Sequence, residues 1–303
     1  MELGYAKQIF LITKKSENVT ERTVEIYQED LDRFFSFLIK GNIFDIVEVS
    51  SRHIREFLIL LQKQGLKGVS RHKFYRELKT FFLFLYRENY LEKNPIADVK
   101  PPKIEQKEMR TYTAAEISKM INSFRKDTFT GFRNYCMFCL FFSTGVRKQE
   151  ALDLTMADIN ITNDLIRIKN GKGQKERHVP IGRIMRRTLM QYLKVRAEFL
   201  KDESCKWLFV THTDKRKLTP SAINGVFHRM KKGLKLTGEK ISCHTWRHTF
   251  AKNYLLNGGD IFSLQKILGH ADIATTKGYL NLNEKEVKMQ HARFNPLDNK
   301  AWL

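Results

Sequence analysis

The stretch of sequence that decides the fold is residues 165–181, which read LIRIKNGKGQKERHVPI. Two short segments with strand-forming residues, 165–168 and 177–181, flank the glycine-rich turn 170–174, and this order is typical of a β-hairpin. Residues 207–210 (WLFV) are a candidate for a third strand. The apolar spacing elsewhere is helical, so we expect a mainly α fold with a small antiparallel β-sheet.

The balance of charge points to a polyanionic partner. The 303 residues include 54 Lys and Arg against 33 Asp and Glu, a formal net charge of +21. Nucleic acid is the partner that such a charge favours, because each neutralised phosphate releases condensed counterions. A ribosome-associated or membrane-surface protein is the alternative. No apolar run approaches the ~18 residues of a membrane span. The four scattered cysteines indicate a reduced, cytoplasmic protein, with Cys136 and Cys139 packed in a helical core.

The region from about residue 20 to residue 94 has the apolar spacing of helices. We expect one helix that ends near Gly41, a second over Ser51–Lys63 and a third from Ser70 to about Asn89. The third presents basic residues on the side opposite its apolar face. Four of them are candidate nucleic-acid contacts: Arg71, Lys73, Arg76 and Lys79.

A proline-rich basic stretch divides the chain. Pro95, Pro101 and Pro102 break helices, and the lysines around them keep the segment solvated. We therefore expect an N-terminal helical domain over 1–94, a linker over 95–110 and a second domain over 111–303. The second domain is predicted to begin with a capping box, Thr113 to Glu116, and to contain an apolar helix over 131–144. Asp260 and Asp272 are expected N-caps, and Gly269 a helix stop.

Arg147 and Arg247 are candidate ligands for one phosphate group. Gly145 lets the backbone turn tightly just before Arg147, so that the guanidinium can face a cleft. Arg247 shares a helix face with His244, three residues earlier. Each guanidinium can donate two hydrogen bonds to non-bridging oxygens, and this stabilisation matters most in a pentacoordinate transition state.

The histidines allow a metal site to be considered. His244 and His248 have the spacing of zinc-binding helices, and His270 or His178 could supply a third ligand. However, no glutamate stands between the first two, and Arg247 would place a positive charge beside the metal. We therefore expect neither metal nor cofactor, and we expect His244 and His270 to contact the phosphate.

Tyr279 is the candidate nucleophile. A phenol with its ordinary pKa of ~10 attacks poorly unless a base or nearby cations assist it, and the arginines and a histidine would do both. Lys172, at the hairpin tip, would donate a proton to a leaving 5′ oxygen, and Lys175 is its nearest competitor. An aryl phosphodiester keeps the energy of the broken bond, so rejoining would need no ATP.

With these residues in this order, the chain resembles the tyrosine recombinases, or phage-type integrases, and most closely their Xer-like members. The resemblance rests on TGVRKQEAL (144–152), GKGQKERHVP (171–180), HTWRH (244–248) and LGH (268–270) followed by Tyr279. The N-terminal helical region, including residues 70–86, is similar to the family's core-binding, SAM-like domain. One departure is Trp246, where the family often has leucine, and we expect it to pack in the core.

The resemblance implies the roles of the site residues. Tyr279 would form a 3′-phosphotyrosyl link and free a 5′-hydroxyl, with Lys172 as general acid and His244 as general acid and base. Arg147, Arg247 and His270 would hold the scissile phosphate. Lys175 and Arg177 join the four basic helical residues as candidate DNA contacts.

The resemblance also implies partners. Family members work as homotetramers on two sites of double-stranded DNA and exchange strands through a Holliday junction. They commonly pass a C-terminal helix to the neighbouring protomer, and residues 284–294 are the candidate for that helix. A second recombinase or an accessory factor remains open.

Two other hypotheses are kept beside site-specific recombination. One is a type IB topoisomerase-like nicking-closing enzyme, since the cleavage chemistry is shared. The other is a non-catalytic DNA-binding protein of the same fold. The two-domain length argues against the first, and the complete set of six site residues against the second. Chromosome-dimer resolution and phage or transposon integration are not separated by the sequence.

Overall fold

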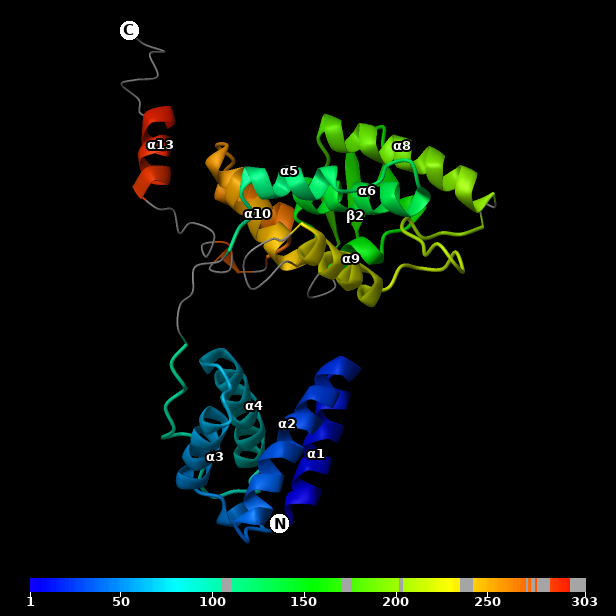
Figure 1. Ribbon diagram of the computed structural model, residues 1–303. Coiled ribbons are helices and arrows are strands. Elements are labelled where there is room, and N and C mark those ends of the chain that lie inside the picture. Colours follow the sequence, from blue (N-terminus) through cyan, green and yellow to red (C-terminus); the bar gives the residue numbers. More distant parts are fainter. Residues whose placement is uncertain are drawn as a thin grey trace. The chain divides into compact units, whose positions relative to one another are not determined.

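The computed structural model describes residues 1–104, 110–169, 176–201, 204–234, 242–270, 272–273, 276 and 284–294 (Figure 1). Lys172, Lys175 and Tyr279 therefore lie outside the described residues. The chain forms two compact units, Met1–Lys107 and Glu108–Leu303. Within the described residues, no helix is both long enough and apolar enough to cross a membrane.

The first unit is a bundle of helices with an aromatic core. Its helices are α1 (Leu3–Ser16), α2 (Glu21–Lys40), α3 (Ser51–Lys63) and α4 (Gly68–Arg87), with a short 3-10 turn, η1 (Ile46–Glu48), between α2 and α3. Phe34, Phe57 and Phe81 are almost fully buried, and edge-to-face ring contacts link them to their neighbours. The three helices predicted from residue spacing are all present.

Helix α1 was not predicted from the sequence. Its buried residue Phe10 packs edge-on against Tyr27 of α2 and Phe81 of α4, at ring-centroid distances of 5.2 and 5.3 Å. The terminal ammonium group of Met1 pairs with Asp45 at 2.6 Å, which ties the start of the helix to the segment after α2. The helix therefore depends on contacts with residues far along the chain, which periodicity within residues 3–16 does not reveal.

The start of the expected linker packs on the first unit. Ile96 and Val99 are 1% and 4% exposed and belong to the aromatic core of that unit. A hydrogen bond of 3.1 Å joins the His72 ring to the Pro102 carbonyl oxygen. Residues 96–102 are thus held along α4 despite their prolines and lysines.

The second unit is mostly helical and contains a three-stranded sheet. Before the sheet come α5 (Ala114–Asn122), α6 (Phe129–Thr144), α7 (Lys148–Leu152) and η2 (Met156–Asp158). The strands β1 (Ile159–Asn160), β2 (Leu165–Ile168) and β3 (Arg177–Pro180) pair antiparallel in the order β1-β2-β3. After the sheet come α8 (Arg183–Leu200), α9 (Pro220–Gly233), α10 (Cys243–Leu256), α11 (Ile261–Leu268) and α13 (Glu284–Phe294).

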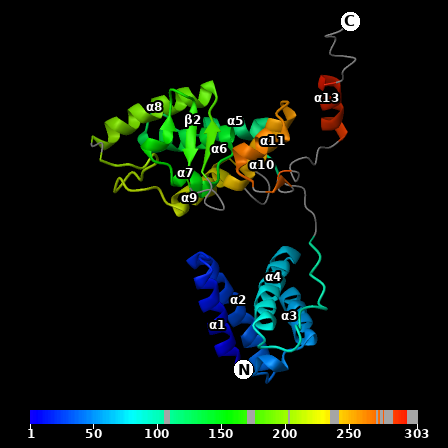
Figure 2. The ribbon, with the colours of Figure 1, turned by 180° about the vertical axis from the view of Figure 1, so that it is seen from behind.

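Helix α6 lies at the centre of this unit. It packs against α8 on one side and α10 on another, and α11 lies beside α10 in both views (Figures 1 and 2). Trp246 of α10 is fully buried among Tyr112, Phe138 and Phe142, as expected from the sequence. Cys136 is buried and Cys139 partly buried in the core around α6, and neither forms a disulfide, which confirms their packing role.

The prediction of a strand at residues 207–210 was wrong. β1 is the third strand, and residues 207–210 make only isolated bridges, Thr155 with Trp207 and Val210 with Lys217. Leu208, Phe209 and Val210 are all fully buried, while Trp207 is half-buried. Side chains take its carbonyl groups: Tyr192 bonds Leu208 O at 2.9 Å and Arg133 bonds Val210 O at 2.7 Å.

Three of the four predicted signals at helix ends are confirmed, and the Asp272 N-cap stays a prediction because most of the residues after it lie outside the described part of the chain. Thr113 and Glu116 form the capping box of α5. The Asp260 side chain accepts from the backbone N–H groups of Phe262 and Ser263 at the start of α11. Gly269 ends α11 in the left-handed conformation, with φ +65°.

Candidate active site

Arg147 is placed by the turn between α6 and α7. Gly145 ends α6 with φ +61°, and its N–H donates to Phe141 O at 3.0 Å. Arg147 is then the N-cap residue of α7, where its N–H and Nη1 donate to the two carboxylate oxygens of Glu150, each at 2.8 Å. The Arg147 side chain remains 26% exposed, so solvent and a ligand can reach it.

Arg247 ties three parts of the site together. Its residue is 4% exposed and lies on α10. Nη1 donates to Gly145 O at 2.6 Å, and Nη2 lies 2.7 Å from Leu268 O and 2.8 Å from His270 Nε2. The guanidinium therefore bonds the turn before Arg147 and the turn that carries His270.

His270 is held as a neutral imidazole. Its Nε2 faces the Arg247 guanidinium, which can only donate, and its Nδ1 lies 2.9 Å from Thr276 Oγ1. Nε2 is therefore the acceptor and Nδ1 carries the proton. Burial of the ring, followed by the charges of Arg247, Arg147 and Arg177, lowers the pKa of His270 to about 4.

His244 and His248 lie on α10 in positive surroundings. The pKa of His244 is lowered, first by partial loss of solvation and then by the charges of Arg247, Lys148 and Arg147. His244 is nevertheless exposed at the surface. Burial, then electrostatic interaction with His244 and Arg247, lowers the pKa of His248 to about 4. No group of three or more His, Cys, Asp or Glu side chains within the described residues is arranged to hold a metal ion.

Glu150 accepts hydrogen bonds from both Arg147 and Arg177, and it was not singled out from the sequence. Burial alone would raise the pKa of its carboxyl, but the Arg177 and Arg147 hydrogen bonds and charges lower it to about 2. The side chain is 4% exposed and is ionised at neutral pH. The available signal was an acidic residue three positions after Arg147 and directly before the buried Ala151 and Leu152.

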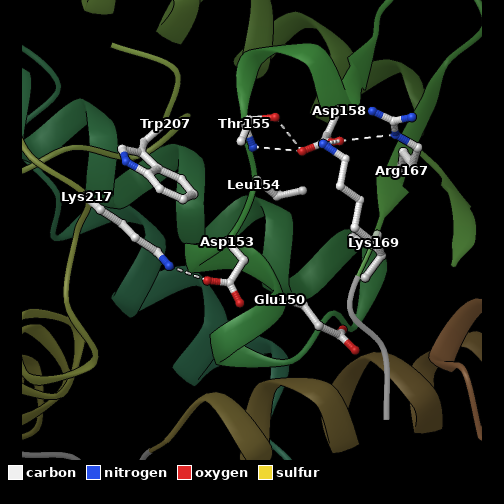
Figure 3. Close-up of a pocket in the computed structure, with 10 residues that line it drawn as sticks. Glu150, Asp153, Leu154, Thr155, Asp158, Arg167, Lys169, Trp207 and Lys217 are labelled. Atoms are coloured by element: carbon white, nitrogen blue, oxygen red, sulfur yellow. Dashed lines mark hydrogen bonds and ion pairs between the residues drawn. The ribbon is translucent and has the colours of Figure 1, made fainter. Parts of the chain in front are cut away.

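Glu150 also lines a cavity of about 330 Å³, whose lining side chains are drawn in Figure 3. Arg167, Lys169 and Thr155 gather round the Asp158 carboxylate, and Lys217 reaches Asp153 on the opposite side. The carboxylates drawn in this cavity are therefore paired with cations. Arg167 and Ile168 of β2 line the cavity, and Arg147 is not among its lining residues.

The candidate DNA contacts on α4 fall into two groups. Arg71 donates to Gln62 at 2.6 Å, and Lys73 pairs with Asp30 at 2.7 Å. Arg76 and Lys79 are exposed. The second pair is therefore the more accessible to a ligand. Lys175 lies outside the described residues, and Arg177 is only 10% exposed and paired within the protein.

The structure thus brings together four of the six predicted site residues. Arg147, Arg247 and His270 form one connected group. The charges of both arginines also lower the pKa of His244. Two guanidinium groups and two imidazoles with lowered pKa values therefore lie close to one another in the second unit. Such a set can bind a phosphodiester and move a proton beside it.

Comparison with known proteins places the chain in a class and then in a family. The second unit matches the model of the phage integrase family over residues 110–286, and residues 10–89 match the phage integrase N-terminal SAM-like domain. The class is that of the tyrosine recombinases. The chain belongs to the phage integrase family.

Curated relatives match over nearly their whole length. Tyrosine recombinase XerD of Halalkalibacterium halodurans is 29% identical over 96% of this chain and 97% of its own. Tyrosine recombinase XerC of Anoxybacillus flavithermus is 30% identical over 92% of this chain and 93% of its own. A solved structure of the Tn1549 transposon integrase with transposon right end DNA covers 97% of this chain and 99% of its own, with 18% identity and a TM-score of 0.78.

Proposed function

We propose that this tyrosine recombinase cuts and rejoins DNA at specific sites through a covalent link to Tyr279. The observation that carries the proposal is the connected group of Arg147, Arg247 and His270, in a chain whose family and charge both point to DNA. Relatives named XerC and XerD support the same activity.

The cleavage step follows from the proposed roles. The Tyr279 oxygen attacks the scissile phosphorus, the bond from phosphorus to the 5′ oxygen breaks, and the phenol proton passes to His244. The lowered pKa of His244 suits this step, because the ring is neutral at pH 7 and can accept. Lys172 gives a proton to the leaving 5′ oxygen, so that a free 5′-hydroxyl results.

The two arginines act on the developing charge. In the transition state the non-bridging oxygens gain negative charge, and Arg147 and Arg247 hold donors toward them without having to reorganise. Because Arg247 is already fixed by two backbone carbonyls, little side-chain entropy remains to be lost on binding. Rejoining reverses the step: the 5′-hydroxyl attacks the phosphotyrosine and releases the phenol.

The proposed assembly is a homotetramer on two sites of double-stranded DNA, with exchange through a Holliday junction. The exposed Arg76 and Lys79 on α4 are proposed DNA contacts, while a second recombinase or accessory factor is compatible with the same chemistry. Helix α13 is the proposed element that passes between protomers.

The test is capture of the covalent adduct. We would select a duplex from a random-sequence pool by binding to the wild-type protein, then nick it beside the cleaved bond so that rejoining fails. Wild-type protein should form a denaturation-resistant adduct, and Tyr279→Phe should form none, because only the hydroxyl is removed. An adduct that persists in Tyr279→Phe would remove this residue from the mechanism.

A second readout separates recombination from simple nicking and closing. Two duplexes with the selected site and different end labels should yield products that combine both labels. Relaxation of supercoiled DNA without any combined product would instead favour a type IB topoisomerase-like enzyme. Tight binding without either reaction would favour the non-catalytic protein.

A further inference from the structure

Arg177 makes a buried three-point contact that none of the proposed catalytic roles uses. It is the first residue of β3, and its side chain is 10% exposed. Nη1 and Nη2 donate to the two Glu150 oxygens at 3.0 and 2.8 Å, and Nε donates to Ile267 O at 2.8 Å. One guanidinium therefore joins β3, α7 and the end of α11.

The turn that carries His270 packs directly on this guanidinium. A Cβ added to Gly269 would lie 2.9 Å from Arg177 Cδ and 3.0 Å from both Cζ and Nε. Gly269 also has φ +65°, a conformation that side chains disfavour. Glycine is thus needed here both for the backbone conformation and for the close approach of Arg177.

The partners of Arg177 are the supports of two proposed phosphate ligands. The Glu150 oxygens that receive Arg177 also receive Arg147 N and Nη1. The α11 end that receives Arg177 Nε continues through Leu268, whose carbonyl accepts from Arg247, to His270. Arg177 thus connects the Arg147 side of the site with the His270 side.

We propose that Arg177 is a positioning residue that sets Arg147 and the His270 turn at the spacing one scissile phosphate requires. The inference rests on the proposed function. It replaces the sequence-based expectation that Arg177 contacts DNA, because its donors are engaged inside the protein. Only arginine has a planar fork that can fill both Glu150 oxygens and still donate Nε to a carbonyl.

The first measurement is single-turnover cleavage of the nicked, selected duplex. Arg177→Lys and Arg177→Met should each form the Tyr279 adduct about 100-fold more slowly, since a misplacement near 1 Å costs on the order of that factor. The matched control is Arg167→Met on the neighbouring strand. Arg167 also pairs with a buried carboxylate, Asp158, but Lys169 bonds the same oxygen at 2.8 Å and remains. This control should cleave at the wild-type rate.

The second measurement asks whether the loss acts through phosphate charge. A methylphosphonate at the cleaved position is neutral, so its transition state carries less negative charge for Arg147 to stabilise. The deficit of Arg177→Met relative to wild type should therefore shrink at least tenfold on this substrate. An equal deficit on both substrates would mean that Arg177 only maintains the fold, and would overturn the proposal.

A double-variant comparison guards against unfolding. Arg177→Met leaves the buried Glu150 charge with fewer partners, whereas Glu150→Gln removes that charge. In the Glu150→Gln background, Arg177→Met should slow cleavage much less than in wild type, because the shared contact is already altered. Fully multiplicative effects would contradict coupling through Glu150.

Binding assays separate the remaining outcomes. The DNA dissociation constant and its salt dependence should stay unchanged in Arg177→Met. Weaker binding with a salt slope reduced by about one would instead identify a phosphate contact and overturn the inference. If Arg177 variants cleave like wild type, the inference fails while the proposed function stands. If wild-type protein forms no adduct, the proposed function fails and the inference with it.

Discussion

Two glycines shape the backbone around the candidate active site. At Gly145 an added Cβ would lie 2.4 Å from Phe250 Cδ1 and 2.8 Å from Leu268 Cδ2, and φ is +61°. The Gly145 carbonyl also receives Arg247. Any side chain at position 145 would therefore push α10 and α11 away from the turn that leads to Arg147. Gly269 has the corresponding role beside Arg177.

Residue chemistry and the family resemblance predicted the arginines and histidines of the candidate site, and tertiary contacts set their protonation and hydrogen bonding. Arg147, Arg247 and His270 were predictable because two guanidiniums and imidazoles suit a phosphate. Their supports were not, because Glu150 and Arg177 are 27 positions apart and meet only after folding. The roles of all six residues stay predictions, and Lys172 and Tyr279 also lie outside the described residues.

His248 should contribute to the loss of stability of the protein in acid. His248 has its pKa lowered to about 4 in the folded protein, against an ordinary value near 6.5. Between those values the unfolded chain binds more protons, so stability is fully present above about pH 6.5 and is lost as pH falls toward 4. We expect the thermal midpoint of His248→Gln to fall less than that of wild type between pH 7 and pH 4.5.

The matched control for this titration is His178→Gln, because His178 is exposed on β3. Its thermal midpoint should follow the wild-type pH dependence, which includes the carboxylates common to all three proteins. If His248→Gln loses as much stability as wild type over the same range, His248 is not held neutral by the fold.

Secondary-structure elements with strong periodicity were predicted well, and the exceptions have a common cause. Three of the four α-helices of the first unit, α2, α3 and α4, and the hairpin strands follow from local spacing and turn residues. Residues 207–210 read as a buried strand because four apolar residues occur together. Side chains from α6 and α8 instead bind the carbonyls of Trp207, Leu208 and Val210, and such partners leave no periodic signal.

Arg196 of α8 is 5% exposed and binds the backbone of the 205–208 segment. Its Nη2 bonds Cys205 O and Trp207 O, both at 2.6 Å, and Nε lies 3.2 Å from Leu208 O. Arg196→Met should lower the free energy of unfolding by about 3 kcal/mol, because buried carbonyls lose a charged donor. Urea unfolding of the purified protein measures this.

A neighbouring variant shows whether that cost is specific. Lys194 lies on the same helix and is exposed, so Lys194→Met should change the unfolding free energy by no more than about 0.5 kcal/mol. Equal effects of Lys194→Met and Arg196→Met would mean that the 205–208 segment does not depend on the arginine.

At the scale of the whole molecule, α13 is the element whose place bears on assembly. A helix over 284–294 was expected from the resemblance, and the structure has it with these bounds. Here it contacts the end of its own chain's α10. Gln290 donates to Leu255 O and Leu256 O at 3.1 and 2.8 Å, and Lys252 pairs with Glu286 at 2.7 Å.

The same contacts can form between copies. A helix that leaves its own α10 can dock on the α10 of a neighbour with identical bonds, as in domain swapping. The proposed tetramer would then form a ring in which each protomer receives one α13 and gives one. Whether the Lys252–Glu286 pair acts within a chain or between chains on DNA can be decided by reversing charges.

The last prediction uses that reversal. In Lys252→Glu, position 252 of α10 and Glu286 of α13 are both negative and repel each other. In Glu286→Lys, Lys252 and position 286 are both positive and repel each other. Each variant alone should assemble on the selected duplex about tenfold less readily, since juxtaposed like charges cost on the order of 1.4 kcal/mol or more. Native gel shifts over a protein titration measure the assembly.

Mixing the two variants distinguishes the arrangements. In a ring that alternates Lys252→Glu and Glu286→Lys protomers, position 252 of each α10 meets position 286 of a neighbour's α13 with the opposite charge. The mixture should therefore recover wild-type assembly. Within a single chain the like charges would persist, and mixing would restore nothing. The doubly reversed variant, Lys252→Glu with Glu286→Lys, should assemble normally in either case and shows that the reversed pair is tolerated. Failure of the mixture beside success of the double variant would therefore place α13 on its own chain in the DNA complex.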